Sequence, residues 1–278
     1  MSKLILSRSF VVLFVVLLSF SILPIVNIKQ VKAQSREIIY IKADGSIEGT
    51  TKIQQTGSTY YFLEDITGSI YINKNNIKLN GNNLKLQSGS QTGISLSEIE
   101  NVTIKNIQII SCSYGMKLSS SSHNNIIGNI ISSNSKDGIF LDSSSNNNIE
   151  DNKISNNGNG IVVGSSSNKN SIIANIIENN GFGLHLWDSS NNKISKNKIE
   201  ANKFGGLYLN PSSNNTISDN SLTNQVESIR LVSNSKINRI IRNNFSNTDI
   251  CISLGSNSTN NIIYFNNFKA NLLQVTCY

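Results

Sequence analysis

The chain has 278 residues, 38% of them hydrophobic, and its 24 Lys and Arg against 17 Asp and Glu give a formal net charge of +7. The basic residues are scattered rather than clustered, which excludes the electrostatic footprint expected of a nucleic-acid-binding protein. Asn and Ser are abundant, but they recur in register, so the composition does not indicate a disordered chain.

Residues 1–33 have the features of a signal peptide. Two basic residues precede an uncharged hydrophobic run over residues 10–23, and Val31-Lys32-Ala33 resembles a small-residue cleavage site. An uncleaved N-terminal anchor is the alternative, because the hydrophobic run extends weakly to Val26. Both interpretations predict a secreted, cell-surface or periplasmic protein that contacts a membrane only through an uncleaved N-terminal segment.

Residues 34–92 contain short strand candidates that are separated by glycines and do not follow a strict repeat. A solenoid needs an atypical end unit to shield its core. We therefore expect this segment to hold an N-terminal cap and the first one or two coils.

Residues 93–278 repeat one pattern eight times: a small residue followed by alternating aliphatics. The repeats begin at Gly93, Gly115, Gly138, Gly160, Gly183, Gly206, Ser228 and Cys251. Their spacing of 22 or 23 residues is typical of stacked-repeat proteins, and each repeat contains two or three short strands and polar turns but no ten-residue helix. The pattern predicts an all-β fold, a single parallel β-helix of about nine or ten coils.

One asparagine recurs at the same slot of seven of the eight repeats. An Ile stands three residues before it and an apolar residue two residues after it. The slot holds Asn129, Asn152, Asn175, Asn197, Asn220, Asn243 and Asn266. Stacked coils would place these amides about 4.8 Å apart, so we predict a structural ladder of hydrogen-bonded asparagines at an inward-facing bend.

Two further patterns carry a resemblance to a known family. Ile39-Tyr40-Ile41-Lys42-Ala43-Asp44-Gly45-Ser46-Ile47 and the Ser-Ser-x-Asn-Asn-x-Ile-x-x-Asn-x-Ile repeats resemble the NosD-like group of exported prokaryotic proteins. This group is called the periplasmic copper-binding protein family, and its repeats are also called carbohydrate-binding and sugar-hydrolysis repeats. The resemblance covers roughly residues 37–270 and implies a right-handed parallel β-helix outside the membrane. Members are associated with copper delivery to a nitrous oxide reductase or with surface polysaccharide.

The residues themselves offer little for copper, which prefers clustered His, Met or Cys ligands. His123 and His185 fall on different coils, and the three cysteines are dispersed. Cys112 and Cys251 are six coils apart, about 29 Å, and cannot bridge, whereas pairing of Cys251 with Cys277 stays open. We predict no metal site and no cofactor.

Carbohydrate binding has a better candidate, on the strand that opens each repeat. The outward slot between two aliphatics holds Phe140, His185 and Tyr208, and Trp187 follows two residues after His185. The predicted ligand-binding residues are Phe140, Asp142, His185, Trp187, Asp188 and Tyr208. Aromatic planes on a flat sheet can stack on sugar rings, so our leading hypothesis is non-catalytic binding of a polysaccharide or glycan. Scattered surface aromatics, or aromatics beneath a loop, are the alternative.

A polysaccharide lyase, hydrolase or epimerase is the second hypothesis. Hydrolysis uses two carboxylates across the scissile bond, but the acids here are thinly spread, and Asp142 and Asp188 are expected two coils apart, about 10 Å. Asn247-Thr248-Asp249 matches one polygalacturonase motif, whose other elements are missing. An accessory protein in the maturation of a copper enzyme is the third hypothesis.

Four acceptor triplets for N-glycosylation occur in this Asn/Ser-rich chain. They begin at Asn101, Asn214, Asn244 and Asn257. Asn214 and Asn257 are the better candidates, because both are expected in turns.

Overall fold

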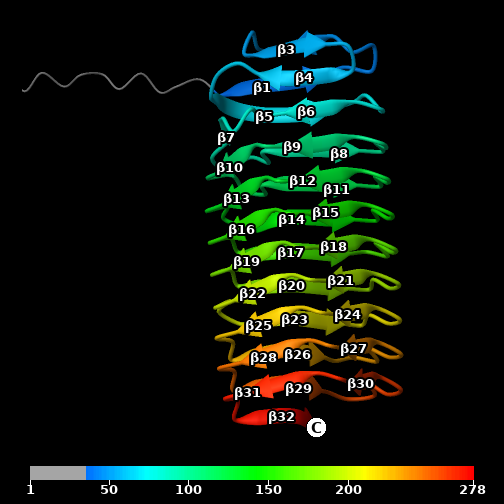
Figure 1. The fold of residues 1–278 in the computed structure, drawn as a ribbon. Helices are drawn as coiled ribbons and strands as arrows, with labels where there is room; N and C mark the ends of the chain where they lie inside the picture. The colour runs from blue at the N-terminus through cyan, green and yellow to red at the C-terminus, as the bar shows by residue number, and fades with distance from the viewer. Residues whose placement is uncertain (1–35) are drawn as a thin grey trace, which may run out of the picture. The chain divides into compact units, whose positions relative to one another are not determined.

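The computed structural model describes residues 36–278. The predicted signal peptide, residues 1–33, lies outside the described residues. Within the described part every regular element is a β-strand, and no helix has the length and hydrophobicity needed to cross a membrane. The strands stack one coil upon another along a single axis (Figure 1).

The coils build three faces of parallel strands, which we name sheets A, B and C. Sheet A contains the regular strands β8 (Ile94–Ser97), β11 (Met116–Ser119), β14 (Asp137–Asp142), β17 (Asn159–Gly164), β20 (Phe182–Trp187), β23 (Gly205–Asn210), β26 (Glu227–Leu231), β29 (Ile250–Leu254) and β32 (Leu273–Cys277). Sheet B contains β6 (Lys78–Asn80), β9 (Thr103–Lys105), β12 (Asn125–Ile127), β15 (Asn148–Glu150), β18 (Ser171–Ile173), β21 (Lys193–Ser195), β24 (Thr216–Ser218), β27 (Arg239–Ile241) and β30 (Ile262–Tyr264). Sheet C contains β7 (Lys85–Gln87), β10 (Gln108–Ile110), β13 (Ile130–Ser132), β16 (Lys153–Ser155), β19 (Ile176–Glu178), β22 (Lys198–Glu200), β25 (Ser221–Thr223), β28 (Asn244–Ser246) and β31 (Asn267–Lys269).

This arrangement confirms the predicted all-β, right-handed parallel β-helix, with about ten turns. Each regular strand pairs in parallel with the equivalent strand of the next coil, as when Ile139 of β14 lies beside Ile161 of β17. Equivalent side chains therefore form columns along the axis.

The N-terminal segment breaks the regular pattern with two antiparallel pairs. Strand β1 (Glu37–Ile41) pairs with β2 (Ile47–Glu48), and β3 (Ile53–Thr56) pairs with β4 (Thr59–Phe62). Strand β5 (Ile66–Ile72) then joins sheet A through β8 and sheet C through β7. The buried Tyr60 donates its hydroxyl to the carbonyl of Gly45 at 2.7 Å, which closes this end of the core. We retain as a proposal the division into residues 1–33, 34–92 and 93–278.

The core consists of aliphatic columns inside the three sheets. In sheet B, from β9 to β27, the inward column is fully buried and consists of isoleucine: Ile104, Ile126, Ile149, Ile172, Ile194, Ile217 and Ile240. Neighbouring coils share each buried surface, so the stability of the stack is collective.

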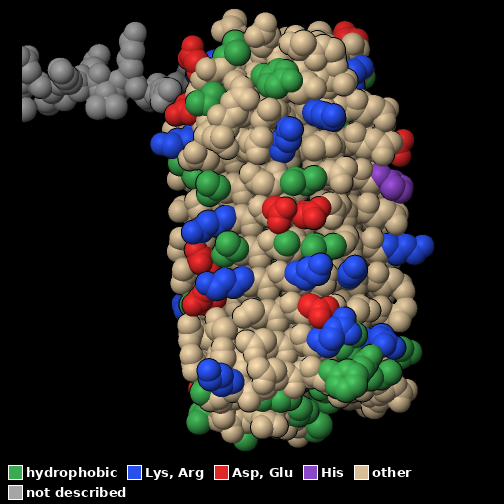
Figure 2. Space-filling model, viewed as in Figure 1, with side chains coloured by type: hydrophobic (Ala, Val, Ile, Leu, Met, Phe, Trp, Pro, Cys, Tyr) green, Lys and Arg blue, Asp and Glu red, His purple; other side chains and the backbone are tan. Residues whose placement is uncertain are grey.

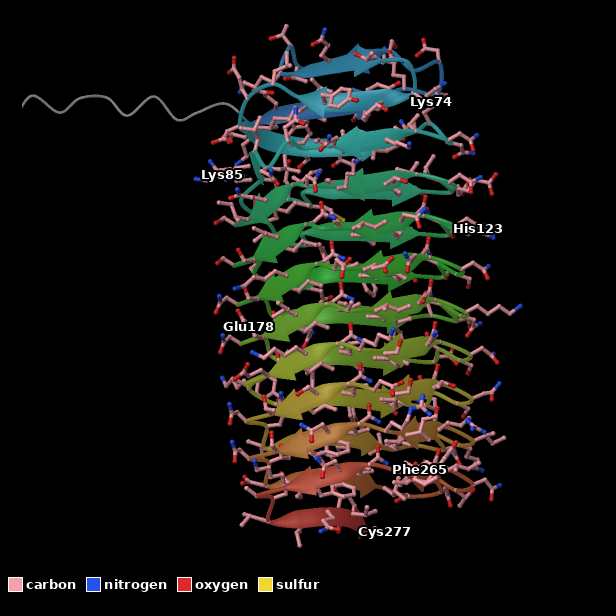
Figure 3. The ribbon with its side chains drawn as sticks, in the orientation of Figure 1. Lys74, Lys85, His123, Glu178, Phe265 and Cys277 are labelled. Carbon is pink, nitrogen blue, oxygen red and sulfur yellow. The ribbon has the colours of Figure 1, made fainter. Side chains whose placement is uncertain are left out.

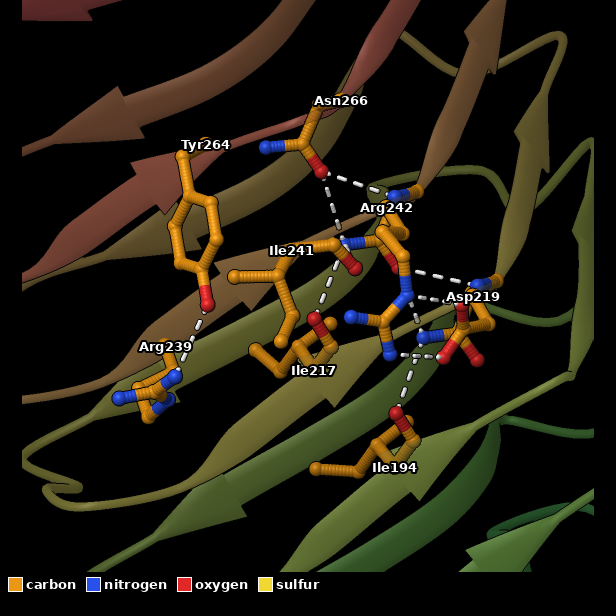
Figure 4. Close-up of polar contacts among 10 residues, drawn as sticks. Ile194, Ile217, Asp219, Arg239, Ile241, Arg242, Tyr264 and Asn266 are labelled. Carbon is orange, nitrogen blue, oxygen red and sulfur yellow. Dashed lines mark hydrogen bonds and ion pairs between the residues drawn. The ribbon is translucent and has the colours of Figure 1, made fainter.

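The asparagine slot lies at the corner between sheets B and C. The side-chain amide nitrogen of each asparagine donates to the side-chain oxygen in the next coil at 2.9–3.1 Å, from Asn129 through Asn266. Backbone N–H groups donate to the same oxygens, for example from Asn243 to Asn266 at 2.9 Å (Figure 4).

Each of these corners turns on a residue in the left-handed region. Ala174, Lys196 and Arg242, which precede ladder asparagines, have φ values of 56°, 59° and 54°. This conformation costs roughly 1–2 kcal/mol for a residue with a side chain. The hydrogen bonds of the neighbouring amide hold the corner in place, so the ladder lets ordinary residues occupy a turn that usually favours Gly or Asn.

Two further asparagine ladders occupy the other corners. The corner before sheet B carries Asn124, Asn147, Asn170, Asn192, Asn215, Asn238 and Asn261. The corner between sheets C and A carries Asn134, Asn157, Asn180 and Asn202, followed by Gln225. The sequence analysis predicted only one ladder, although the other two recur with the same period.

The cysteines form no disulfide. Cys251 and Cys277 are both free, which corrects the pairing left open above. The strand register places Leu254, not Cys251, beside Cys277, so the two cysteines lie three residues out of register, about 10 Å along the strand. Burial raises the pKa of the Cys251 thiol to about 11 and also raises the pKa of Cys112.

Candidate functional site

The outer face of sheet A carries three columns of outward side chains. The central column is continuous through the strand register and reads Lys117, Phe140, Val162, His185, Tyr208, Arg230 and Ser253. One flanking column contains Asp137, Asn159 and Phe182, and the other contains Asp142, Gly164 and Trp187. The sheet thus gathers Phe140, His185, Trp187 and Tyr208 on one face.

A cluster of four rings covers the middle of this face. Phe182 stacks on Tyr208, with ring centroids 5.1 Å apart and planes 13° apart. His185 packs against both, at 5.9 Å from Phe182 and 5.0 Å from Tyr208. Phe204, which is 55% exposed, extends the cluster at 5.6 Å from Phe182.

A second group of rings lies on the coils that precede this cluster. Tyr114 stacks on Phe140 with centroids 5.7 Å apart. Trp187, 48% exposed, reaches toward Phe140 across Gly164: a Cβ placed on Gly164 would lie 3.1 Å from Trp187 Cε3 and 3.6 Å from Phe140 Cε2. The absence of a side chain at Gly164 lets two aromatic residues from coils two apart converge.

Cations accompany the aromatic rings. Lys117 Nζ lies 5.6 Å from the centroid of Phe140, and Lys136 Nζ lies 4.9 Å from that of Tyr114. The guanidinium carbon of Arg230 lies 5.9 Å from the centroid of Tyr208. Such pairs restrain both partners. The guanidinium group of Arg230 is also paired with the carboxylate of Glu227, at 3.6 Å.

Acidic residues are present, but they are not paired across the face. Asp142 belongs to the same column as Trp187, whereas Asp188 begins the exposed turn that follows, where Ser166 Oγ donates to its carboxylate at 3.4 Å. Asp137 accepts a hydrogen bond from Asn159 Nδ2 at 2.8 Å. Burial raises the pKa of Asp137, and the bond from Asn159 and the charge of Lys136 oppose this shift.

His185 has an unusual environment for a surface strand. Its Nε2 atom is buried and has no hydrogen-bond partner. Burial lowers the pKa of His185 below its ordinary value of 6.5, so the imidazole is neutral at pH 7. The ring therefore behaves as part of the apolar cluster.

The sequence analysis missed Tyr114, Phe182 and Phe204. The alternation that places His185 outward would place Phe182 inward, but Gly183 and Leu184 both face the core. A Cβ on Gly183 would meet Ile199 Cγ2 at 2.9 Å, and Leu184 is fully buried. This break in alternation at the start of each sheet A strand turns Phe182 back to the surface. The glycine that begins each repeat is the sequence feature that could have indicated this break in alternation.

The remaining predicted positions lie away from this face or at its borders. The predicted glycosylation residues Asn101, Asn214, Asn244 and Asn257 are all exposed. His123 projects from a turn at the edge of the stack, far along the chain from His185 (Figure 3). On the view in Figure 2, basic and acidic side chains are interspersed over the coils.

Copper prefers clustered His, Met or Cys ligands. Residues 36–278 contain no group of three or more His, Cys, Asp or Glu side chains that could hold a metal ion. Cys112, Cys251 and Met116 are buried in the core, and burial keeps both thiols protonated. The described side chains therefore do not fit a copper centre, and no chemical step is derived through one.

The stacked coils define a right-handed parallel β-helix protein with aromatic side chains on the outer face of sheet A. The model of the family described as "Periplasmic copper-binding protein (NosD)" matches residues 29–230 and 186–278, and the chain belongs to this family. The predicted resemblance is thereby confirmed, and a periplasmic family agrees with an extracellular or periplasmic location. No curated protein matches the chain.

Several solved structures share the fold of this chain. An alginate lyase from Paenibacillus sp. str. FPU-7 matches with a TM-score of 0.54 and 13% identity, over 75% of this chain and 92% of that one. A periplasmic alginate epimerase matches with a TM-score of 0.55 and 15% identity, over 86% and 84%. The Dettilon tailspike protein matches with a TM-score of 0.59 and 16% identity, over 86% of this chain and 59% of that one. At such identities the likeness establishes the fold alone.

Proposed function

We propose that this protein binds an extracellular or periplasmic polysaccharide along the outer face of sheet A. The observation that carries the proposal is the run of aromatic rings that spans successive coils, from Tyr114 and Phe140 through Trp187 to Phe182 and Tyr208. Sugar rings present flat C–H faces that stack on aromatic planes, and their hydroxyls need polar partners nearby. Asp142, Asn159 and Asn210 border the rings and supply such partners.

The geometry of the stack suits a polymer better than a single small molecule. Coils repeat every ~4.8 Å along the axis, so rings on successive coils offer a series of contacts to an extended chain. Contacts that are weak individually add up along a polymer when one molecule engages several of them. The carbohydrate-acting neighbours support this ligand class without defining the sugar.

The test is binding of the purified chain to a glycan array, followed by titration with the best oligosaccharide. Trp187→Ala and Tyr208→Ala should each weaken binding while circular dichroism and the melting temperature stay close to wild type. Phe265→Ala is the matched control, because Phe265 is 80% exposed on another corner of the stack. Unchanged binding in both test variants would refute the proposed face.

A second candidate function is favoured by one specific arrangement. His185, Tyr208 and Arg230 occupy the central column on three successive coils. In a β-elimination on a uronate polymer, a base removes the C5 proton, the C4–O4 bond breaks, a C4=C5 double bond forms and an acid protonates O4. A neutral imidazole, a phenol and a guanidinium can serve as base, acid and partner of the carboxylate.

Turnover distinguishes this candidate from binding alone. The elimination creates an unsaturated product that absorbs in the ultraviolet, whereas epimerisation changes the sugar without cleaving the chain. If the protein is a lyase, His185→Ala should abolish product formation, a loss far larger than any loss of polymer binding. A lack of turnover on uronate polymers by the wild-type chain would leave the non-catalytic proposal as the better description.

The role in copper-enzyme maturation rests on the family description alone. The described residues supply no donor cluster for it. Such a role would require contact with a partner protein, which pull-down with a nitrous oxide reductase would test.

A further inference from the structure

A hollow lies at the corner where sheet C turns into sheet A, beside the aromatic face. Its volume is about 450 Å³, and we name it the corner groove. Its lining includes Asn156, Gly158, Asn179, Gly181, Lys203 and Phe204. None of these residues was among the predicted ligand-binding residues.

Two glycines line the hollow. The residue that follows the ladder asparagine at this corner is Gly158 in one coil and Gly181 in the next. A Cβ on Gly158 would lie 2.6 Å from the carbonyl oxygen of Lys136, and a Cβ on Gly181 would lie 2.0 Å from that of Gly158. The close approach of the preceding coil's backbone therefore requires glycine at both positions. The preceding and following coils carry Ser135 and Lys203 at this position.

The corner groove is continuous with the aromatic face. Phe204, 55% exposed, forms one wall, and its ring lies 5.6 Å from that of Phe182. Phe182 in turn stacks on Tyr208 in the central column. A polymer held on sheet A thus meets an unbroken path of rings that leads over Phe204 into the groove.

The polar lining indicates the chemistry of the occupant. Among the described residues that line the corner groove, Lys203 is the one that carries a charge. Its Nζ lies 5.1 Å from the centroid of Phe204. The exposed amides of Asn156 and Asn179 supply further donors. The groove lining holds an ammonium group and amide donors but no carboxylate, which suits an anionic group that carries several acceptor oxygens.

We propose that the corner groove is a subsite for one acidic sugar residue, whose ring contacts Phe204 and whose carboxylate or sulfate contacts Lys203. The subsite rests on the proposed function, because it extends the path of the polymer bound on sheet A. The subsite also gives the bound polymer a direction. The polymer crosses the coils obliquely toward the corner rather than running only along the axis of the stack.

The experiment is calorimetric titration of the purified protein and its variants with three probes of equal length. The probes are an oligo-uronate, a sulfated oligosaccharide and a neutral cello-oligosaccharide. Lys203→Met should lower the affinity for an acidic probe roughly tenfold at low salt and leave the neutral probe unchanged. Lys203→Arg should keep most of the affinity. Phe204→Ala should weaken all probes that reach the groove.

Lys193→Met is the control, because Lys193 is exposed on sheet B and away from the groove. The acidic probe that loses more affinity in Lys203→Met identifies carboxylate or sulfate as the natural group. Equal loss for neutral and acidic probes, or no loss, would overturn the subsite. If Trp187→Ala and Tyr208→Ala weaken binding while Lys203→Met does not, only the subsite fails. If none of these variants matters, the proposed function fails with it.

Discussion

The ring of Phe182 lies nearly parallel to that of Tyr208 on the next coil, with centroids 5.1 Å apart. The two residues do not occupy the same column, since Phe182 pairs with Gly205 and Tyr208 with His185. The missing side chain at Gly205 leaves room for Phe182 to lean toward the central column. Glycines at 164 and 205 thus shape the aromatic face as much as the aromatic residues themselves do.

The first prediction concerns Gly164. In Gly164→Val the new side chain would enter the space where Trp187 Cε3 lies 3.1 Å from the Cβ position, so the indole must move. We expect oligosaccharide affinity to fall about twofold to tenfold, the range expected for loss of one aromatic contact. Trp187 is the only tryptophan in the chain, so its fluorescence spectrum reports the displacement directly.

Ser119→Val serves as the control for this variant. Ser119 lies in the same column two coils before Gly164 and is half-buried. An unchanged emission spectrum and unchanged affinity in Gly164→Val would show that Trp187 does not depend on the glycine.

The second prediction concerns the ladder at the corner between sheets B and C. Asn175 accepts hydrogen bonds from the backbone and side chain of Asn152 and donates to Ile149, Ile173 and Asn197. Asn175→Ala leaves several buried donors and acceptors unpaired, each of which costs about 1–3 kcal/mol. The free energy of unfolding in urea should therefore fall by at least that amount.

Asn125→Ala is the matched control, because Asn125 is a half-buried residue on the outer surface of sheet B. Its loss should change the free energy of unfolding by less than about 0.5 kcal/mol. Equal losses of unfolding free energy in the two variants would show that the hydrogen bonds of the ladder do not stabilise the fold.

The third prediction concerns Asp137 and pH. Burial raises the pKa of this carboxyl in the folded chain, so folding favours its protonated form. The contribution of Asp137 to stability is present below its ordinary pKa of 3.8 and is lost as the pH rises through the folded value. Asp137→Asn should therefore raise the melting temperature at pH 7, while the bond from Asn159 can be kept by the amide oxygen.

The same variant should lose its advantage near pH 3, where Asp137 is protonated in the folded and unfolded chain. Melting temperatures measured from pH 3 to pH 7 give the comparison. A constant difference between variant and wild type across this range would contradict a partly buried, titrating Asp137.

The fourth prediction concerns the cysteines. Cys277 is exposed, whereas Cys112 and Cys251 are buried and their pKa values are raised. Since the thiolate is the reactive form, one thiol should react quickly with a disulfide reagent in the native chain and all three after unfolding. Cys277→Ser should remove the fast phase. A fast phase that persists in this variant would place a second thiol at the surface.

The sequence alone was sufficient for the stack. A period of 22 or 23 residues and a period of two within each repeat are both read along the chain, and together they predicted the columns of Ile126, Asn152 and Tyr208. Such patterns are local, because the position of a residue within one coil is enough to predict whether its side chain points inward or outward. The central column of the aromatic face follows from the same reasoning.

Only the tertiary structure decided how the columns meet. Phe182 faces outward because Gly183 and Leu184 both turn inward, and the rings of Trp187 and Phe140 both approach Gly164 from the coils on either side of it. The corner groove is likewise lined by glycines of two neighbouring coils and by a phenylalanine of a third. These relationships join residues one or two coils apart, and the space between them is set by side-chain contacts that no single repeat contains.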